Sequence, residues 1–155
     1  MYIQTDMGKI VAVCISEKKG IQKRNIGKCR AIKHYGLEGD AHAGKWHRQV
    51  SLLATESADV MRNKGLEIKD GDFGENIVTS GIELKSLPVG TTLKIGNDIL
   101  IRVTQIGKLC HDRCAIYYKA GDCIMPREGI FAEILNNGII ATGDEISILE
   151  ESVEK

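Results

Sequence analysis

Three cysteines crowd into a short stretch of the second half of the chain. Cys110 and Cys114 are four residues apart, and Cys123 follows nine residues later. Cationic or ionisable side chains lie beside them: His111, Arg113 and Arg127. Positive neighbours lower the pKa of a thiol and raise the fraction of thiolate, which attacks sulfur and binds soft metals. We therefore expect a functional thiolate here, as a sulfur acceptor or a metal ligand.

Two other interpretations of these cysteines remain open. Cys110-x3-Cys114 has the spacing of one half of a structural zinc site, which normally contains two such pairs. The second pair is missing, so zinc would need Cys123 and a distant histidine, and zinc is the less favoured metal. The thiols could also be purely structural, because a free cysteine often behaves as a small buried hydrophobe.

A glycine-containing stretch in the first half, Gly36 to Gln49, gathers further cations. Lys45, His47 and Arg48 could hold a phosphate, with glycine N–H groups approaching it closely. Gly39 to Lys45 has the spacing of a P-loop, but tryptophan follows where that motif needs Ser or Thr for magnesium. The sequence therefore indicates an anion site rather than a nucleotide site, and a solvated loop is the alternative.

A third stretch is Gly71-Asp72-Phe73-Gly74-Glu75-Asn76-Ile77. Phe73 is expected in the core, and Asn76 is expected to stabilise a turn. The alternative is that Glu75 or Asn76 lines a ligand pocket. Familiar catalytic templates are missing: the sequence has no G-x-S-x-G elbow, no H-E-x-x-H and no G-x-G-x-x-G after a strand.

The elements that must position these residues are mostly short strands. Apolar runs and alternation predict strands over residues 10–15, 28–34, 50–54, 76–79, 91–95, 99–106 and 145–149. Gly96-Asn97-Asp98 predicts a hairpin turn between two of them. One helix is predicted from Glu56 to Lys64, capped by Thr55 and stopped by Gly65, and a second from Pro126 to about Asn136. This pattern predicts a mainly β fold, a closed or folded-over β-barrel with a few short helices.

Composition limits the classes of protein. The chain has 155 residues, which fit a single domain over residues 1–155. Its 21 basic and 21 acidic side chains cancel, which argues against a nucleic-acid partner. No signal peptide and no run of about 18 apolar residues is present, so we expect no membrane contact and a cytoplasmic protein with reduced thiols. Cys14 and Cys29 fit buried strand positions.

As a set, these motifs resemble the MOSC domain, named for the C-terminal domain of molybdenum cofactor sulfurases. The similarity runs from about Lys9 to Leu149. Its motifs are Gly39-Asp40-Ala41-His42-Ala43-Gly44 leading to Arg48-Gln49-Val50-Ser51-Leu52-Leu53, then Phe73-Gly74-Glu75-Asn76-Ile77, Leu87-Pro88-Val89-Gly90-Thr91-Thr92-Leu93-Lys94-Ile95-Gly96, the cysteine region, Gly129-Ile130-Phe131-Ala132 and Gly143-Asp144-Glu145-Ile146.

The resemblance implies a β-barrel and a role in molybdenum cofactor chemistry or sulfur transfer. Family members carry a late cysteine that holds persulfide sulfur from a pyridoxal-phosphate cysteine desulfurase, or ligates molybdenum. Cys110, after Gly107, is the nearest match, although Leu109 stands where the family often has proline. Cys114 and Cys123 remain alternatives. Arg48 would by position hold the phosphate of the pterin.

These considerations define one predicted site and three functions. The thiolate is expected from Cys110, Cys114 or Cys123, with Cys110 as the metal ligand; the residues expected to bind the cofactor are Lys45, His47, Arg48, Asn76, Arg113 and Arg127. The basic stretch and the cysteine stretch should then meet in one pocket.

The favoured hypothesis is a protein that binds molybdopterin or carries sulfur. Its partners would be a desulfurase or enzymes of the molybdenum cofactor pathway, and pyridoxal phosphate would be bound only by the desulfurase. The alternatives are a molybdenum reductase of N-hydroxylated compounds that takes electrons from a partner, and a zinc-stabilised binding module. Whether the protein is an enzyme stays open.

Overall fold

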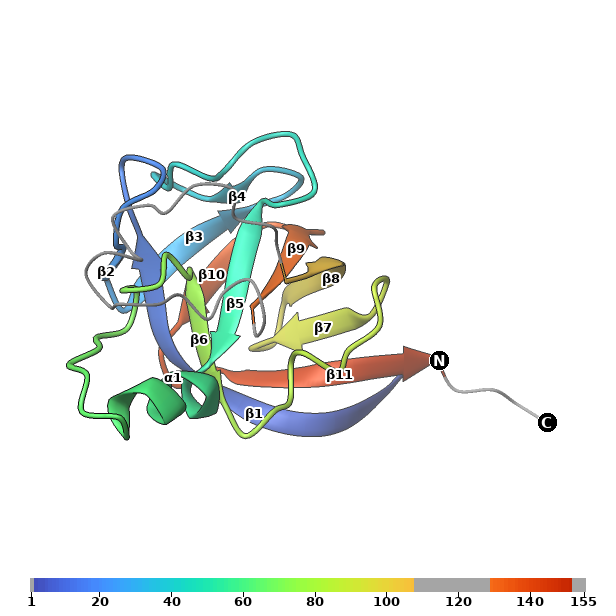
Figure 1. The fold of residues 1–155 in the computed structure, drawn as a ribbon. Coiled ribbons are helices and arrows are strands. Elements are labelled where there is room, and N and C mark those ends of the chain that lie inside the picture. The colour runs from blue at the N-terminus through green and yellow to red at the C-terminus, as the bar shows by residue number, and fades with distance from the viewer. Residues whose placement is uncertain (1, 108–128, 152–155) are drawn as a thin grey trace.

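Seven strands close into a barrel in the computed structural model, which describes residues 2–107 and 129–151. They are β1 (Tyr2–Ile15), β5 (Val50–Ala54), β6 (Ile77–Ser80), β7 (Thr92–Ile95), β8 (Ile99–Ile106), β9 (Ile130–Ile134) and β11 (Glu145–Glu151). Around the ring the order is β1-β11-β7-β8-β9-β5-β6, and β6 returns to β1 (Figure 1). Closure leaves no free sheet edge in the ring, which confirms the predicted mainly β barrel.

A second, smaller sheet lies beside the barrel. It consists of β3 (Lys28–Ile32), flanked by β10 (Gly138–Ala141) and β4 (Gly36–Leu37). The short strand β2 (Arg24–Asn25) pairs with the end of β1. The sequence predicted β3 as part of residues 28–34 but gave no strand at 2–9, 24–25, 36–37 or 138–141.

The barrel interior is built by alternation along the strands, which β-bulges interrupt in β1 and β8. In β5, Val50, Leu52 and Ala54 face the main core, whereas Leu53 faces outward into a second apolar cluster. That outer cluster joins Leu53 to Ala58, Met61, Ile68, Phe73 and Phe131, and it seats the helix against the barrel wall. Phe73 is completely buried, which confirms its predicted place in the core.

Helix α1 (Thr55–Arg62) begins directly after β5, which confirms the predicted helix, but the predicted cap by Thr55 is wrong. Ala54 occupies the N-cap position and no side chain caps the helix. Thr55 is the first helical residue, and its hydroxyl accepts a hydrogen bond from Arg62 Nη1 at 3.3 Å. No helix in the described ranges is long and apolar enough to cross a membrane.

The second predicted helix is wrong where the structure describes it, because residues 130–134 form strand β9. β9 pairs with both β5 and β8, and apolar side chains are buried on both of its faces: Ile130, Ala132 and Ile134 in the main core and Phe131 in the outer cluster. A strand buried on both faces reads as a continuous apolar run, which periodicity cannot distinguish from a buried helix. The predicted hairpin is confirmed: Ile95 pairs with Ile99 across Gly96-Asn97-Asp98, and Gly96 has a positive φ of 62°.

Candidate functional site

The predicted anion-binding residues lie on the loop that enters β5. We call residues 38–49 the basic loop. In Figure 1 this loop lies at the upper end of the barrel, and α1 lies at the lower end, past the other end of β5. Lys45, Trp46 and His47 are exposed, and Arg48 is half-buried where the chain enters the sheet.

Gln105, on β8, binds the two basic side chains of the loop that lie nearest the barrel, Arg48 and His47. Its side-chain nitrogen donates to the carbonyl of Gly107 at 2.7 Å, which fixes its oxygen as the acceptor. That oxygen accepts hydrogen bonds from Arg48 Nε at 3.0 Å and from His47 Nε2 at 2.8 Å. The hydroxyl of Thr104 donates to the carbonyl of His47. Strand β8 therefore holds the end of the basic loop in place.

A β-bulge explains why Gln105 points to this site. Val103 pairs with Ala132 and Gln105 pairs with Phe131, so Thr104 is an extra residue in β8. Val103 faces the barrel interior, and simple alternation would turn Gln105 inward as well. The bulge instead places it on the outer side together with Phe131. The Arg48 guanidinium carbon lies 5.2 Å from the Phe131 ring centroid.

The basic side chains at the end of the basic loop lie beside aromatic rings. Arg48 also lies 6.0 Å from the ring centroid of Trp46, and Lys19 lies 4.9 Å from the same centroid. Within residues 2–107 and 129–151, no carboxylate forms an ion pair with Lys45, His47 or Arg48. Such a group of basic side chains beside aromatic rings is suited to binding an anion such as a phosphate.

Both ends of the cysteine-containing stretch leave the barrel at this place. The amide of Gly107 donates to the carbonyl of Gly129 at 2.7 Å, and the carbonyl of Gly107 accepts from Gln105. Arg48 and residue 107 are therefore linked through one side chain. The predicted site residues between those two glycines lie outside the described residues: Cys110, Cys114, Cys123, Arg113 and Arg127.

A buried ion pair lies behind the basic loop. Lys23 Nζ lies 2.7 Å from Asp40 Oδ1, and both side chains are completely buried. Asp40 also accepts hydrogen bonds from the backbone N–H groups of Ser16 and His42. Burial lowers the pKa of Lys23, and the carboxylate of Asp40 opposes that shift. The pair joins the loop after β1 to the basic loop.

The MOSC family model matches residues 39–147, more than two thirds of the chain. The chain belongs to the MOSC domain family. This family is associated with the molybdenum cofactor. None of the curated proteins matches the chain at a significant level.

Solved structures show the same MOSC fold at low sequence identity. The YuaD protein from Bacillus subtilis has a TM-score of 0.78 and 20% identity, with 98% of this chain and 100% of that chain covered. YiiM from Geobacillus stearothermophilus has a TM-score of 0.70 and 20% identity, covering 95% and 77% of the two chains. YiiM from Escherichia coli has a TM-score of 0.60 and 16% identity, covering 94% and 72%.

Asn76 of this MOSC protein holds strands together beneath the site. Its Oδ1 accepts from the backbone N–H of Ser51 at 2.9 Å, and its Nδ2 donates to the carbonyl of Cys14 at 3.0 Å. The residue is 1% exposed. The side-chain amide of Asn76 thus links β5 to β1, which is a structural role. The predicted contact of Asn76 with the cofactor stays a prediction.

Replacing Asn76 with alanine is expected to lower the free energy of unfolding by about 2–4 kcal/mol, because it leaves the buried Ser51 N–H and Cys14 carbonyl without partners. Urea unfolding followed by circular dichroism measures the loss. Asn63→Ala, at the exposed end of α1, is the control and should change stability by less than about 0.5 kcal/mol. Equal stabilities for the two variants would contradict the structural role of Asn76.

Burial raises the pKa of three ionisable side chains, Glu75, Cys14 and Cys29. Burial raises the pKa of Glu75 to about 7, while hydrogen bonds from the backbone N–H groups of Glu75, Gly71 and Phe73 act in the opposite direction. Burial also raises the pKa values of the Cys14 and Cys29 thiols. Both thiols are therefore neutral near pH 7, which fits the structural role predicted for these two cysteines.

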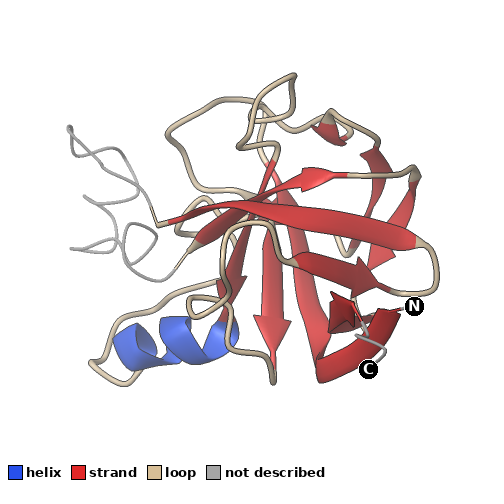
Figure 2. Ribbon diagram, turned by 90° about the vertical axis from the view of Figure 1, so that its right-hand side faces the viewer, coloured by secondary structure: helices blue, strands red, loops and turns tan. Residues whose placement is uncertain are grey.

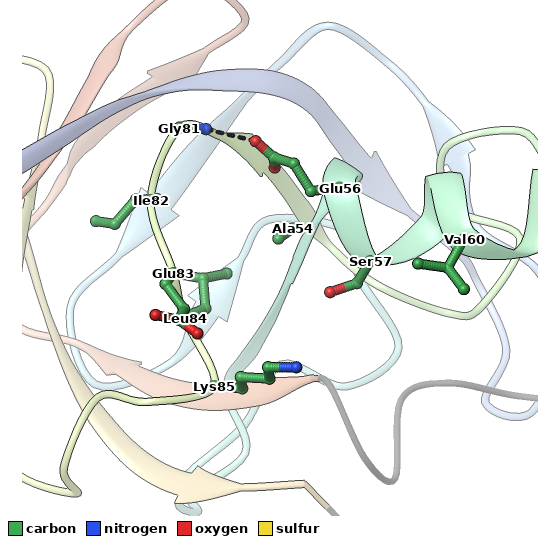
Figure 3. A pocket seen from close by; sticks show the side chains of 9 residues that line it. All are labelled: Ala54, Glu56, Ser57, Val60, Gly81, Ile82, Glu83, Leu84 and Lys85. Atoms are coloured by element: carbon green, nitrogen blue, oxygen red, sulfur yellow. Dashed lines mark hydrogen bonds between the residues drawn. The ribbon is translucent and has the colours of Figure 1, made fainter.

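A separate cavity of about 360 Å³ lies beside α1 (Figure 3). Its apolar wall is made by Ala54, Val60, Ile82 and Leu84. In Figure 3, Glu56 points from the start of the helix to the backbone N–H of Gly81, at 2.8 Å. Because α1 and the basic loop are at opposite ends of β5, roughly 17 Å apart, this cavity is not part of the anion site. The helix and the barrel wall beside it are also visible in Figure 2.

Sequence patterns missed two residues of this site. Gln105 lies on a strand in which buried and exposed side chains alternate, and no sequence motif indicates the bulge that turns Gln105 outward. Lys23 lies in a polar stretch and looks like a solvated lysine, yet its side chain is completely buried.

Among the residues that the structure describes, no three His, Cys, Asp or Glu side chains are grouped so as to hold a metal ion.

Proposed function

We propose that this MOSC protein binds the molybdenum cofactor at the basic loop and presents a cysteine of residues 108–128 for sulfur or metal chemistry. The observation that supports this proposal most directly is the link from Arg48 through Gln105 to Gly107. Two stretches separated by about sixty residues, one cationic and one rich in thiols, start from the same place on the barrel.

The described residues fit the anionic part of the cofactor. Arg48 uses Nε for Gln105, and within the described residues none of its hydrogen bonds involves the two terminal guanidinium nitrogens. These nitrogens, with Lys45 and the imidazole of His47, would hold the pterin phosphate through charge-assisted hydrogen bonds. The ring of Phe131 covers one side of the guanidinium and limits its contact with water. When bound, molybdenum supplies a thiophilic centre, for which Cys110 is the proposed ligand.

The proposed carrier step is thiol exchange. The thiolate attacks the outer sulfur of a persulfide on a partner cysteine desulfurase and forms a new S–S bond. The S–S bond in the donor breaks, and the donor cysteine leaves as a thiolate with the electron pair. The product is a persulfide on this protein, so no external oxidant or reductant is needed.

Incubation with a cysteine desulfurase and cysteine is expected to add one sulfur atom, about 32 Da, to the intact protein. Cys110→Ser should abolish the adduct, and Cys114→Ser and Cys123→Ser should keep it. Cys29→Ser is the control, because its thiol is buried and neutral. Loss in the Cys114 or Cys123 variant alone would reassign the acceptor, and absence of an adduct on every form would end the carrier proposal.

Metal analysis of the purified protein tests the cofactor separately. Molybdenum together with pterin absorbance supports the proposed function. One equivalent of zinc without pterin would contradict it and favour a zinc-stabilised binding module.

A further inference from the structure

The ammonium group of Lys23 has three hydrogen-bond acceptors among the described residues. Nζ lies 2.7 Å from Asp40 Oδ1, 3.0 Å from Ser16 Oγ and 3.0 Å from His42 Nδ1. A lysine ammonium has three N–H donors and no acceptor, so the three contacts use all three protons. An uncharged amine would leave the buried Asp40 carboxylate without a cation.

The protons of this network can therefore be placed. The hydroxyl of Ser16 donates its own hydrogen to the carbonyl of Lys18 at 2.9 Å, so it accepts from Lys23. The carboxylate of Asp40 can only accept. His42 Nδ1 must also accept, so it carries no proton. The imidazole of His42 is then neutral, with its proton on Nε2.

The same network fixes the course of the basic loop. Asp40 Oδ2 accepts from the backbone N–H of His42 at 3.2 Å, and the carbonyl of His42 accepts from Trp46 Nε1 at 2.8 Å. Trp46 in turn lies against Arg48. A chain of contacts thus runs from the buried ammonium to the guanidinium that is proposed to bind phosphate.

The backbone of Lys23 is held equally firmly. Its N–H donates to the carbonyl of Gly71 at 2.8 Å. Gly71 has a φ of 94°, and a Cβ at this position would lie 2.2 Å from the carbonyl oxygen of Lys23. Only glycine allows this approach. Lys23 is therefore the point at which the loop after β1, the basic loop and the loop before β6 meet.

We propose that Lys23 is a positioning residue of the anion site: its ammonium holds His42 as the neutral Nε2–H tautomer and, through Asp40, fixes the basic loop. The first part stands on the geometry alone, and the second rests on the proposed function of that loop. Within residues 2–107 and 129–151, the charged or titratable groups that act on Lys23 include Asp40, His42, Cys14 and Glu75. With its Nδ1 against an ammonium, His42 serves as an N–H donor and neither as a base nor as an added cation.

Nitrogen-15 NMR of the histidine rings tests the tautomer, with the His42 signals assigned by their loss in His42→Gln. Wild-type His42 is expected to show an unprotonated Nδ1 and a protonated Nε2 from pH 5.5 to 8, whereas an ordinary histidine titrates at about pH 6.5. Lys23→Met removes the N–H donor from His42 Nδ1, so the imidazole of His42 should titrate between pH 5.5 and 8. If Lys23→Met fails to fold, Lys23→Met/Asp40→Asn replaces it. The double variant removes the carboxylate together with the ammonium, so no unpaired charge is left buried. Ser16→Ala is the control: it keeps the contacts of Lys23 with Asp40 and His42, and the tautomer should not change.

Binding of inorganic phosphate, followed by the fluorescence of Trp46, tests the positioning role. The folded Lys23 variant is expected to bind phosphate about tenfold more weakly than the wild type and Ser16→Ala. A protonated Nδ1 or an ordinary titration of His42 in the wild type would overturn the proposal, even if no Lys23 variant folds. Unchanged phosphate affinity in a folded variant would overturn its second part. If the wild type itself binds no phosphate, the proposed function fails, and the NMR result still decides the role of Lys23 toward His42.

Discussion

Arg48→Met is expected to weaken binding of inorganic phosphate and of molybdopterin by about tenfold to a hundredfold, the usual value of a hydrogen-bonded charge. Methionine keeps the apolar contact with Phe131 but removes the guanidinium, which is half-buried and held by Gln105. Isothermal titration calorimetry measures the affinity. Quenching of Trp46, the only tryptophan of the chain, provides a second reading at the same loop.

Arg102→Met is the matched control for this prediction. Arg102 lies on β8, three residues before Gln105, but its side chain is exposed and forms an ion pair with Glu133 at 3.0 Å. The control removes the same charge from the protein without touching the basic loop. Equal losses in the two variants would mean that net charge alone attracts the anion, and would contradict a specific site at Arg48. Arg48→Lys should lie between the wild type and Arg48→Met, because lysine keeps the charge but not the planar fork.

The barrel was predictable because most of its strands have one face inside and one outside. The hairpin from Thr92 to Ile106 shows this well: Ile95, Ile99 and Ile101 alternate with polar or less buried neighbours, and glycine and asparagine mark the turn. β9 was mistaken for a helix because its neighbours bury both of its faces. Ile130, Ala132 and Ile134 enter the main core and Phe131 enters the outer cluster, so Glu133 alone marks the outer face with a polar side chain.

In the candidate site, only the residues whose side-chain type itself indicates anion binding were predictable from the sequence. Lys45, His47 and Arg48 were found because cations beside glycines suit an anion, and the structure places them on one loop end. Gln105 was not predictable, since its direction depends on a bulge at Thr104. The burial of Lys23 depends on Asp40, a partner seventeen residues away that closes over it only in the folded chain.

Glu75→Gln is expected to stabilise the protein at pH 8 by about 2 kcal/mol and to give no advantage at pH 5. Glu75 is 1% exposed, and burial raises its pKa from 4.5 to about 7. Since each pKa unit corresponds to about 1.4 kcal/mol, ionisation of this group costs the folded protein up to about 3 kcal/mol. Part of that gain is lost in the variant, because the amide NH2 replaces an oxygen that accepts backbone N–H groups.

The sign of the pH dependence follows from the raised pKa. The folded protein holds the Glu75 proton more tightly than the unfolded chain does, so protonation favours folding. The contribution is fully present below about pH 4.5, declines as pH rises, and is lost once pH passes about 7. In the variant this part of the pH dependence should be missing.

Urea unfolding at pH 5, 6, 7 and 8 measures the difference between wild type and variant. Glu83→Gln is the control, because Glu83 is an exposed glutamate at the rim of the cavity beside α1 and should show no such dependence. The hydrogen bond from the Phe73 N–H, 3.0 Å from Glu75 Oε1, remains possible with glutamine, so the variant tests the charge rather than the contact. A stability difference that is the same at every pH would show that Glu75 does not hold a proton in the folded protein at pH 6.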